Sequence, residues 1–190
     1  MSVRNQWATI PNALSAYRLL AFPMLIFSIL KDYEQLFAIL IVINLITDIL
    51  DGVIARVFNM ATELGARLDS IADYTTYAAA IWGLFAFKWT FLEPHLISFL
   101  IFLGLFLSTI GFALAKFGRM PSLHLYSFKI GGYLQGIFFF ITFAFEFYDW
   151  AYYIMLIWSY FAFVEHITVQ IVIPEMKSNA KGLYWVLKEK

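Results

Sequence analysis

Four aspartates in an apolar part of the sequence are the residues whose types and spacing could do chemistry. Asp48 and Asp51 are three positions apart, and Asp69 and Asp73 are four positions apart. On an α-helix each pair would share one face, with its two carboxylates close together. Carboxylate oxygens are the ligands that Mg²⁺ and other hard divalent cations prefer. The four aspartates therefore predict a metal site.

The surroundings of these aspartates make them costly. An aspartate near the centre of a bilayer costs roughly 2.5–3.5 kcal/mol, so four could cost about 10 kcal/mol. A bound divalent cation is the simplest compensation. The alternative from another class is a cation- or proton-coupled transporter that uses the carboxylates as an ion pathway. Transporters more often have broken helices and internal repeats, and this sequence shows neither pattern.

The composition predicts a membrane protein. Of the 190 residues, 62% are hydrophobic, 20% are aromatic and 14% are charged, and the mean hydropathy is +0.77. A soluble domain of this size could not bury so much apolar surface. The chain has no cysteine, which excludes disulfides, zinc–thiolate sites and thiol catalysis. A net charge of zero, with no strongly basic region, argues against nucleic-acid binding.

Six apolar stretches of spanning length predict an all-α, polytopic membrane protein with six transmembrane helices. They cover residues 13–30, 35–57, 64–87, 95–115, 123–145 and 150–172. Residues 1–12 predict a short N-terminal interfacial segment, because they are polar but include Trp7 and Ile10. Residues 174–190 predict a polar tail. No repeat or linker interrupts the chain, so residues 1–190 are expected to form a single membrane-embedded domain.

The charge distribution predicts the orientation. With six spans, both termini face the same side, which would carry nine of the lysines and arginines, whereas Lys31 and Lys88 lie opposite. The positive-inside rule then makes both termini and the tail cytoplasmic, in the plasma or inner membrane if the protein is bacterial. Two aspartates lie late in the second span and two lie early in the third. We therefore expect all four at one depth, open to the cytoplasm.

The aspartates belong to a longer motif, D-x-x-D-G-x-x-A-R followed after eight residues by G-x-x-x-D-x-x-x-D. Its eight fixed positions are Asp48, Asp51, Gly52, Ala55, Arg56, Gly65, Asp69 and Asp73. This pattern resembles the signature of the CDP-alcohol phosphatidyltransferase family. The N-terminal run Ile10-Pro11-Asn12-Ala13-Leu14-Ser15, with Arg18 and Pro23 after it, is similar to the family's common opening. Six spans with cytoplasmic termini also match the family's architecture.

The resemblance implies an enzyme, a transferase of phospholipid biosynthesis. Its substrates would be CDP-diacylglycerol and a small polar alcohol. The acceptor hydroxyl would attack the phosphorus that bears the lipid, and CMP would leave. One or two Mg²⁺ or Mn²⁺ ions would hold the pyrophosphate. Members of the family commonly form homodimers in the membrane, so a homodimer is expected here.

The resemblance also implies a role for each motif residue. Asp48, Asp51 and Asp69 would be metal ligands, and Asp73 would be the general base and a further ligand. The CDP-binding residues would be Gly52, Ala55 and Gly65, which leave room for the nucleotide, and Arg56, near the phosphates. Small residues at these positions would equally allow two helices to pack closely, so that interpretation remains open.

The acceptor-binding residues are expected in and before the fifth span. Lys129 and Gln135 match part of a segment found in phosphatidylglycerophosphate-forming members, and Arg119 and His124 precede them. This favours glycerol-3-phosphate as the acceptor. The third-span run from Asp69 to Asp73 is instead similar to phosphatidylserine-forming members, so serine and an inositol phosphate remain alternatives.

Arg18, Glu165 and His166 also lie inside the predicted spans. Arg18 fits the family opening, and it equally fits an arginine that anchors the helix to lipid headgroups. Glu165 and His166 lie in the sixth span. They predict helix pairing or an oligomer contact rather than catalysis.

Overall fold

The computed structural model of the chain describes residues 9–60, 62–119, 123, 125–175 and 180–188. All regular secondary structure in these residues is helical, which confirms the all-α prediction. The chain divides into two compact units, residues 1–92 with 142–146 and residues 93–141 with 147–190. A single functional domain over residues 1–190 stays a prediction.

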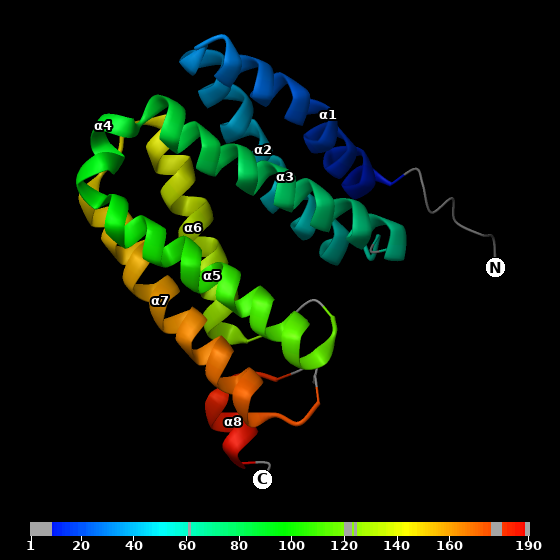
Figure 1. Ribbon diagram of the computed structural model, residues 1–190. Coiled ribbons are helices and arrows are strands. Elements are labelled where there is room, and N and C mark those ends of the chain that lie inside the picture. The colour runs from blue at the N-terminus through cyan, green and yellow to red at the C-terminus, as the bar shows by residue number, and fades with distance from the viewer. Residues whose placement is uncertain (1–8, 61, 120–122, 124, 176–179, 189–190) are drawn as a thin grey trace, which may run out of the picture. The chain divides into compact units, whose positions relative to one another are not determined.

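The first unit is built from three long helices. They are α1 (Ile10–Leu30), α2 (Glu34–Val57) and α3 (Glu63–Phe87), followed by the short α4 (Trp89–Leu92). Helix α1 packs against both α2 and α3 along most of its length (Figure 1). Fully buried side chains from all three helices form the core, among them Leu25, Phe37, Ile41 and Leu84. These three helices carry every residue of the aspartate motif.

Threonines cap the first turns of α1 and α3. Thr9 Oγ1 accepts a hydrogen bond from the backbone N–H of Asn12 at 3.3 Å. Thr62 Oγ1 accepts one from the backbone N–H of Gly65 at 2.9 Å. Each cap satisfies a backbone donor that has no partner within its helix. Pro11 lies in the first turn of α1, where its missing N–H costs nothing.

The turn between α2 and α3 brings the two halves of the motif together. Asn59 follows the end of α2 with a left-handed φ of +50°, and the N–H of Met60 donates to the carbonyl of Ala55 at 2.9 Å. This is a Schellman motif, which ends a helix tightly. The chain can then enter α3 within a few residues. The late part of α2 and the early part of α3 consequently lie at the same level, as the sequence predicts.

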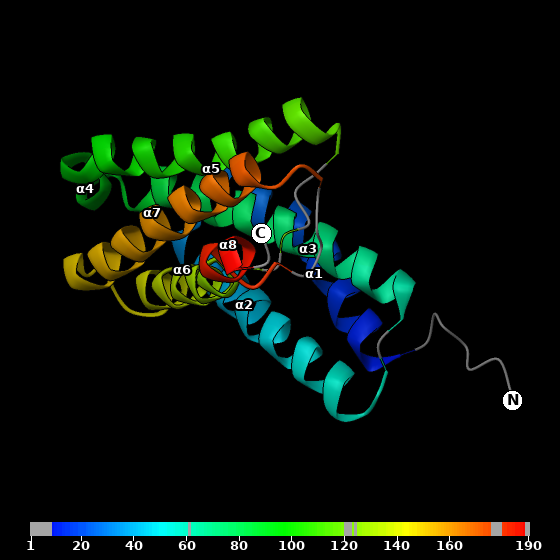
Figure 2. The same ribbon diagram turned by 90° about the horizontal axis from the view of Figure 1, so that it is seen from below.

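The second unit contains η1 (Glu93–His95), α5 (Leu96–Phe117), α7 (Asp149–Val172) and α8 (Leu183–Lys188). It also contains α6 (Tyr126–Ala144) except for its last three residues. Helices α5 and α7 lie side by side (Figure 2). Helix α8 packs against α7, and its Val186 is buried in a cluster with Ala113, Leu125 and Val169. Residues 183–188 of the predicted polar tail thus form a short helix, of which Val186 and Leu183 join this core. The cytoplasmic location of residues 174–190 stays a prediction.

Five helical segments are long and apolar enough to cross a membrane, and they identify an integral membrane protein. These are Ile10–Leu30, Glu34–Val57, Trp89–Phe117, Tyr126–Ala144 and Asp149–Val172. Helix α3 has 25 residues but carries four charged side chains in its first half, and it is not among the five. The count of six spans stays a prediction.

The first helix begins earlier than the predicted first span. Thr9 caps it, so Ile10, Pro11 and Asn12 form its first turn. The interfacial location of residues 1–12 stays a prediction. Residues 1–8 of that predicted segment lie outside the described residues.

Candidate active site

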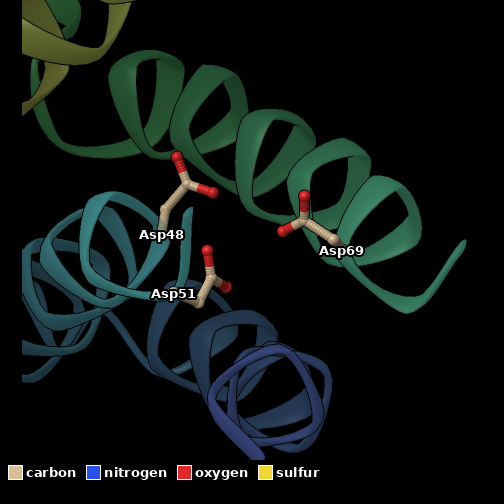
Figure 3. Close-up of side chains that lie close together, drawn as sticks. All are labelled: Asp48, Asp51 and Asp69. Carbon is tan, nitrogen blue, oxygen red and sulfur yellow. The ribbon is translucent and has the colours of Figure 1, made fainter. Parts of the chain in front are cut away.

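The aspartates of the motif converge between α2 and α3. Asp48 and Asp51 lie on α2 and Asp69 lies on α3, and their carboxylates point toward one another (Figure 3). One oxygen from each lies within 4.8 Å of the others. Asp51 is buried, with 5% of its side chain exposed, whereas those of Asp48 and Asp69 are 43% and 42% exposed. The site is therefore walled on one side and open on the other.

Arg18 of α1 binds all four aspartates. Its Nη1 donates to Asp48 Oδ1 and Asp73 Oδ1, each at 2.6 Å. Its Nη2 donates to Asp51 Oδ2 at 2.5 Å and Asp69 Oδ1 at 2.6 Å. The arginine side chain is 0% exposed. Asp73 therefore belongs to the same cluster as the other three carboxylates.

Sequence reasoning missed this role of Arg18, because it weighed the arginine only as a family-opening residue or a headgroup anchor. The anchoring prediction is wrong, since the guanidinium is buried and makes its ion pairs inside the protein. An arginine inside an apolar span is costly unless it is paired. The four aspartates of the motif also lie in apolar spans and need a positive partner. That shared need was the signal that could have linked Arg18 to them.

The donor set fits a divalent cation. Asp48, Asp51 and Asp69 offer only carboxylate oxygens, which suit Mg²⁺ and Mn²⁺ and do not suit softer metals. One guanidinium neutralises one of the four carboxylate charges when all are ionised, so the cluster keeps an excess of negative charge. The spacing of the three oxygens needs only a small closure to meet a common ion at about 2.0–2.6 Å.

An open pocket adjoins the cluster. Its empty space, part of which is open solvent, is about 310 Å³, and it is bounded by the first turns of α1 and α3 and the last turns of α2. Asp51 and Asp69 form part of its wall. The other lining residues include Asn12, Ser15, Gly52, Ala55 and Gly65. A ligand that occupies this pocket would therefore contact the carboxylate cluster directly.

The two motif glycines of this pocket have different neighbours. A Cβ added at Gly65 would lie 2.4 Å from Asn12 Oδ1 and 2.9 Å from Thr62 Oγ1. Its smallness is therefore required by the close approach of α1. A Cβ added at Gly52 would meet nothing nearer than Arg56 Nη2, at 3.7 Å. Gly52 thus leaves an open surface on α2, and Arg56 Nε donates back to the Gly52 carbonyl at 2.8 Å.

Ser15 and Asn12 are two further residues that sequence reasoning did not assign to the site. Ser15 Oγ is within hydrogen-bond distance of Asp51 Oδ2, at 3.3 Å, and of the Pro11 carbonyl, at 3.2 Å. Asn12 is buried beside Gly65. Both lie in the N-terminal run that resembles the family opening, and Arg18 follows Ser15 by three positions. These spacings place the three side chains on one side of α1.

The residues expected to bind the acceptor belong to the second unit. Lys129 is exposed on α6, and Arg119 is exposed just after the end of α5. Gln135 is buried on α6, where its Nε2 donates to Ser159 Oγ at 3.0 Å. His124 lies outside the described residues. The acceptor-binding roles of these four residues stay predictions.

Comparison with known proteins gives a family and several partial relatives. The family model for CDP-alcohol phosphatidyltransferases matches residues 8–165. A CMP-forming cardiolipin synthase and mitochondrial hydrolase fusion protein of Schizosaccharomyces pombe is 36% identical over 73 residues, 38% of this chain and 12% of the relative. A CDP-diacylglycerol–glycerol-3-phosphate 3-phosphatidyltransferase of Rickettsia bellii is 40% identical over 67 residues, 34% of this chain and 37% of the relative.

A putative cardiolipin synthase of Mycobacterium bovis is 32% identical over 84 residues, 43% of this chain and 40% of the relative. The chain thus matches less than half the length of each of these three relatives. No solved structure matches the chain. The family match spans more than half of the chain and includes all four aspartates and Arg18. The chain therefore belongs to the CDP-alcohol phosphatidyltransferase family.

Proposed function

We propose that this protein transfers a phosphatidyl group from CDP-diacylglycerol to a small polar alcohol, with release of CMP, in the presence of Mg²⁺ or Mn²⁺. The observation that carries the proposal is the convergence of four aspartates from α2 and α3 beside an open pocket. Phosphoryl transfer depends mainly on charge neutralisation and on in-line positioning of the reacting oxygens. Clustered carboxylates that hold a divalent cation meet the first of these needs.

Asp48, Asp51 and Asp69 would hold the cation, with Asp73 as a further ligand. A bound divalent cation would neutralise the charge on the pyrophosphate oxygens of the CDP-lipid. The pocket next to Asp51 and Asp69 has the position expected for the CDP moiety. Gly52 leaves its face of α2 accessible, and Ala55 lines the same wall. These features support nucleotide binding by Gly52, Ala55 and Arg56.

Asp73 is the general base in this proposal. Its side chain is 49% exposed, and its Oδ1 accepts from Arg18. The exposed half of this carboxylate is accessible to a hydroxyl group. Asp73 would take the proton of the acceptor hydroxyl as that oxygen bonds to the phosphorus bearing the lipid. The bond from that phosphorus to the CMP oxygen breaks in the same displacement.

The favoured acceptor is glycerol-3-phosphate. The name of the Rickettsia relative gives this acceptor for that protein. Two other relatives are named as cardiolipin synthases, so a cardiolipin-type acceptor is a second candidate. Serine and an inositol phosphate remain alternatives on the third-span pattern. A glycerol hydroxyl is thus the acceptor chemistry that the relatives support.

The orientation and the assembly are also parts of the proposal. The lysines and arginines predict that both termini and the aspartate cluster face the cytoplasm. A homodimer is expected from the family. Thiol labelling of single cysteines introduced at exposed positions would test the orientation, because the natural chain has no cysteine. Cross-linking in native membranes would test the dimer.

The experiment that tests the function uses purified protein in detergent with CDP-diacylglycerol and Mg²⁺. Labelled glycerol-3-phosphate, phosphatidylglycerol, serine and inositol phosphate are supplied separately, and lipid products are separated by thin-layer chromatography. We expect CMP release together with one labelled lipid product from a glycerol-type acceptor. A product only from serine or inositol phosphate would correct the acceptor. No CMP release with any acceptor would contradict the enzyme and favour the transporter.

A further inference from the structure

We infer that Arg18 is the resident counter-ion of the aspartate cluster. It holds the four carboxylates together while no divalent cation is bound, and a divalent cation displaces it from them. The inference rests on the proposed function only in taking the cluster as the cation site. It makes Arg18 a positioning residue that sets both the stability of the metal-free site and the affinity of the site for metal.

The hydrogen bonds of Arg18 join the two helices that carry the aspartates. Nη1 bonds Asp48 of α2 and Asp73 of α3. Nη2 bonds Asp51 of α2 and Asp69 of α3. Each terminal nitrogen thus bridges α2 to α3. The planar guanidinium presents its donors in a fixed fork, so it fixes the relative positions of the four carboxylates.

Arg18 is needed as a bridge because the direct packing between α2 and α3 is limited. Helix α1 packs extensively against each of them, whereas α2 and α3 contact each other over a shorter stretch. Four carboxylates at this separation repel one another when ionised. Arg18 is the cation that offsets this repulsion in the metal-free protein, and its fully buried side chain strengthens the attraction.

The same bonds place Arg18 in competition with a metal ion. The three clustered carboxylates, those of Asp48, Asp51 and Asp69, all accept hydrogen bonds from it, and so does Asp73, the proposed further ligand. A metal ion draws its ligand oxygens to about 2.0–2.6 Å. A guanidinium nitrogen between the same oxygens would then lie against a second positive charge. The cation and the guanidinium therefore exclude each other from the centre of the cluster.

One atom of Arg18 is not satisfied by this arrangement. Its Nε is buried and makes no hydrogen bond among the described residues. A buried donor without a partner is unfavourable. The present position therefore satisfies the two terminal nitrogens at the expense of Nε. A movement of the side chain that let Nε find an acceptor would offset part of the loss of the carboxylates.

The test measures Mn²⁺ binding and thermal unfolding of the purified full chain in detergent. Free Mn²⁺ is quantified by electron paramagnetic resonance for the wild type and for Arg18→Gln. Arg67→Gln is the matched control, because it removes one positive charge from an exposed position of α3, two residues from Asp69. We expect Arg18→Gln to bind Mn²⁺ at least about tenfold more tightly, since a competing positive charge has gone. The control should match the wild type.

Thermal unfolding supplies the second readout. In EDTA, Arg18→Gln should unfold at a lower temperature than the wild type, and added Mn²⁺ should raise its unfolding temperature more than that of the wild type. If Arg18→Gln is recovered only when it is purified with Mn²⁺, that rescue also supports the inference. Arg18→Lys keeps the charge with fewer fixed donors, so its Mn²⁺ affinity should lie between those of the wild type and Arg18→Gln.

Two results would overturn the inference. Weaker Mn²⁺ binding in Arg18→Gln would show that the arginine supports the metal rather than competing with it. Equal binding would show that the guanidinium does not occupy the cation site. Neither result depends on catalysis. If instead Arg18→Gln binds Mn²⁺ more tightly but the wild type releases no CMP from CDP-diacylglycerol, the inference stands and the proposed function fails.

Discussion

The two units of the chain bury their polar side chains in different ways. In the first unit, charged groups from three helices meet at one point, where Arg18 faces four aspartates. In the second unit, the buried glutamines each bond one or two polar neighbours. Gln135 donates to Ser159 at 3.0 Å, and Gln170 Nε2 donates to the Thr109 carbonyl at 3.0 Å.

Two charged residues of the second unit, Lys116 and Glu165, also have local structural partners. Lys116 Nζ donates to the carbonyls of Gln170, Ile171 and Ile173 at 2.8, 2.9 and 3.0 Å, and so caps the end of α7. Glu165 accepts from Ser127 Oγ and from the backbone N–H of Leu183, which ties α8 to α7. The prediction that Glu165 serves helix pairing is confirmed.

This difference indicates that buried polar groups serve stability in the second unit and chemistry in the first. A polar side chain that is matched by one partner stabilises the fold and has little left to offer a ligand. Four ionised carboxylates around one guanidinium keep a net negative charge, so the aspartate cluster attracts divalent cations. Substitutions in the first unit should therefore change activity more than stability, and substitutions in the second unit should do the reverse.

Removal of metal is the largest expected effect. EDTA should abolish CMP release, and added Mg²⁺ or Mn²⁺ should restore it, because the carboxylates cannot hold an anionic pyrophosphate without a cation. CMP is measured by chromatography after dialysis against chelator and readdition of each metal. Full turnover in EDTA would contradict the metal site, and Ca²⁺ serves as the control for a hard cation of larger radius.

Loss of one metal ligand should come next. Asp51→Asn and Asp69→Asn should each lower CMP release by about 10³-fold, in the range seen when one electrostatic contact to a transition state is removed. Circular dichroism should show retained helix. Glu63→Gln is the matched control, because Glu63 is an exposed carboxylate in the first turn of α3. Wild-type turnover in either aspartate variant would remove that residue from the site.

Loss of the general base should lower activity less than loss of a metal ligand, and it should affect the transfer step more than binding. Asp73→Asn should lower the rate of transfer by about 10²-fold, near the lower end for general base catalysis. Binding of CDP-diacylglycerol should change less, because three carboxylates remain. Single-turnover kinetics separates the two steps. If the CDP-lipid affinity falls as much as the rate, Asp73 acts as a ligand and not as the base.

The two glycines of the pocket offer a sharper contrast within the first unit. Gly65→Ala would place a methyl group 2.4 Å from Asn12 Oδ1, and we expect it to lower stability by about 1–3 kcal/mol through overpacking. Gly52→Ala meets no atom nearer than 3.7 Å. It should leave stability unchanged or raise it by up to about 1 kcal/mol, through the higher helix propensity of alanine.

Activity then separates the two interpretations of these small residues. If Gly52→Ala lowers the affinity for CDP-diacylglycerol without loss of stability, Gly52 makes room for the nucleotide. Denaturation in detergent and CDP-lipid binding are measured on the same preparations. Equal stability of both variants would contradict the close approach of α1 to α3 at Gly65.

The smallest effect is expected in the second unit. Gln170→Met should destabilise the protein by about 0.6 kcal/mol, the average found for a hydrogen bond between membrane helices. It removes the bond to Thr109 and the contact between Gln170 Nε2 and His166 Nδ1 at 2.9 Å. CMP release by the folded protein should stay at the wild-type level. A loss of activity beyond the loss of folded protein would show that this pair does more than support α5 and α7.

The sequence by itself determined the features that depend on local spacing. The i, i+3 and i, i+4 aspartates share helix faces because of the helical period, and the turn near Asn59 is short enough to return the chain at the same level. Apolar length alone predicts the helices, with boundaries within a few residues. The family pattern was readable for the same reason, since its eight positions lie within 26 residues of the sequence.

Only the tertiary structure decided which distant residues complete the site. Arg18 lies 30 to 55 positions from its four partners, and no periodicity in the sequence links it to them. Three other contacts also join residues that are distant in the sequence. They are the contact of Asn12 with Gly65, the packing of α8 into its core and the hydrogen bonds of Glu165. Spacing along one helix fixes which side chains share a face, whereas the packing of helices decides what that face meets.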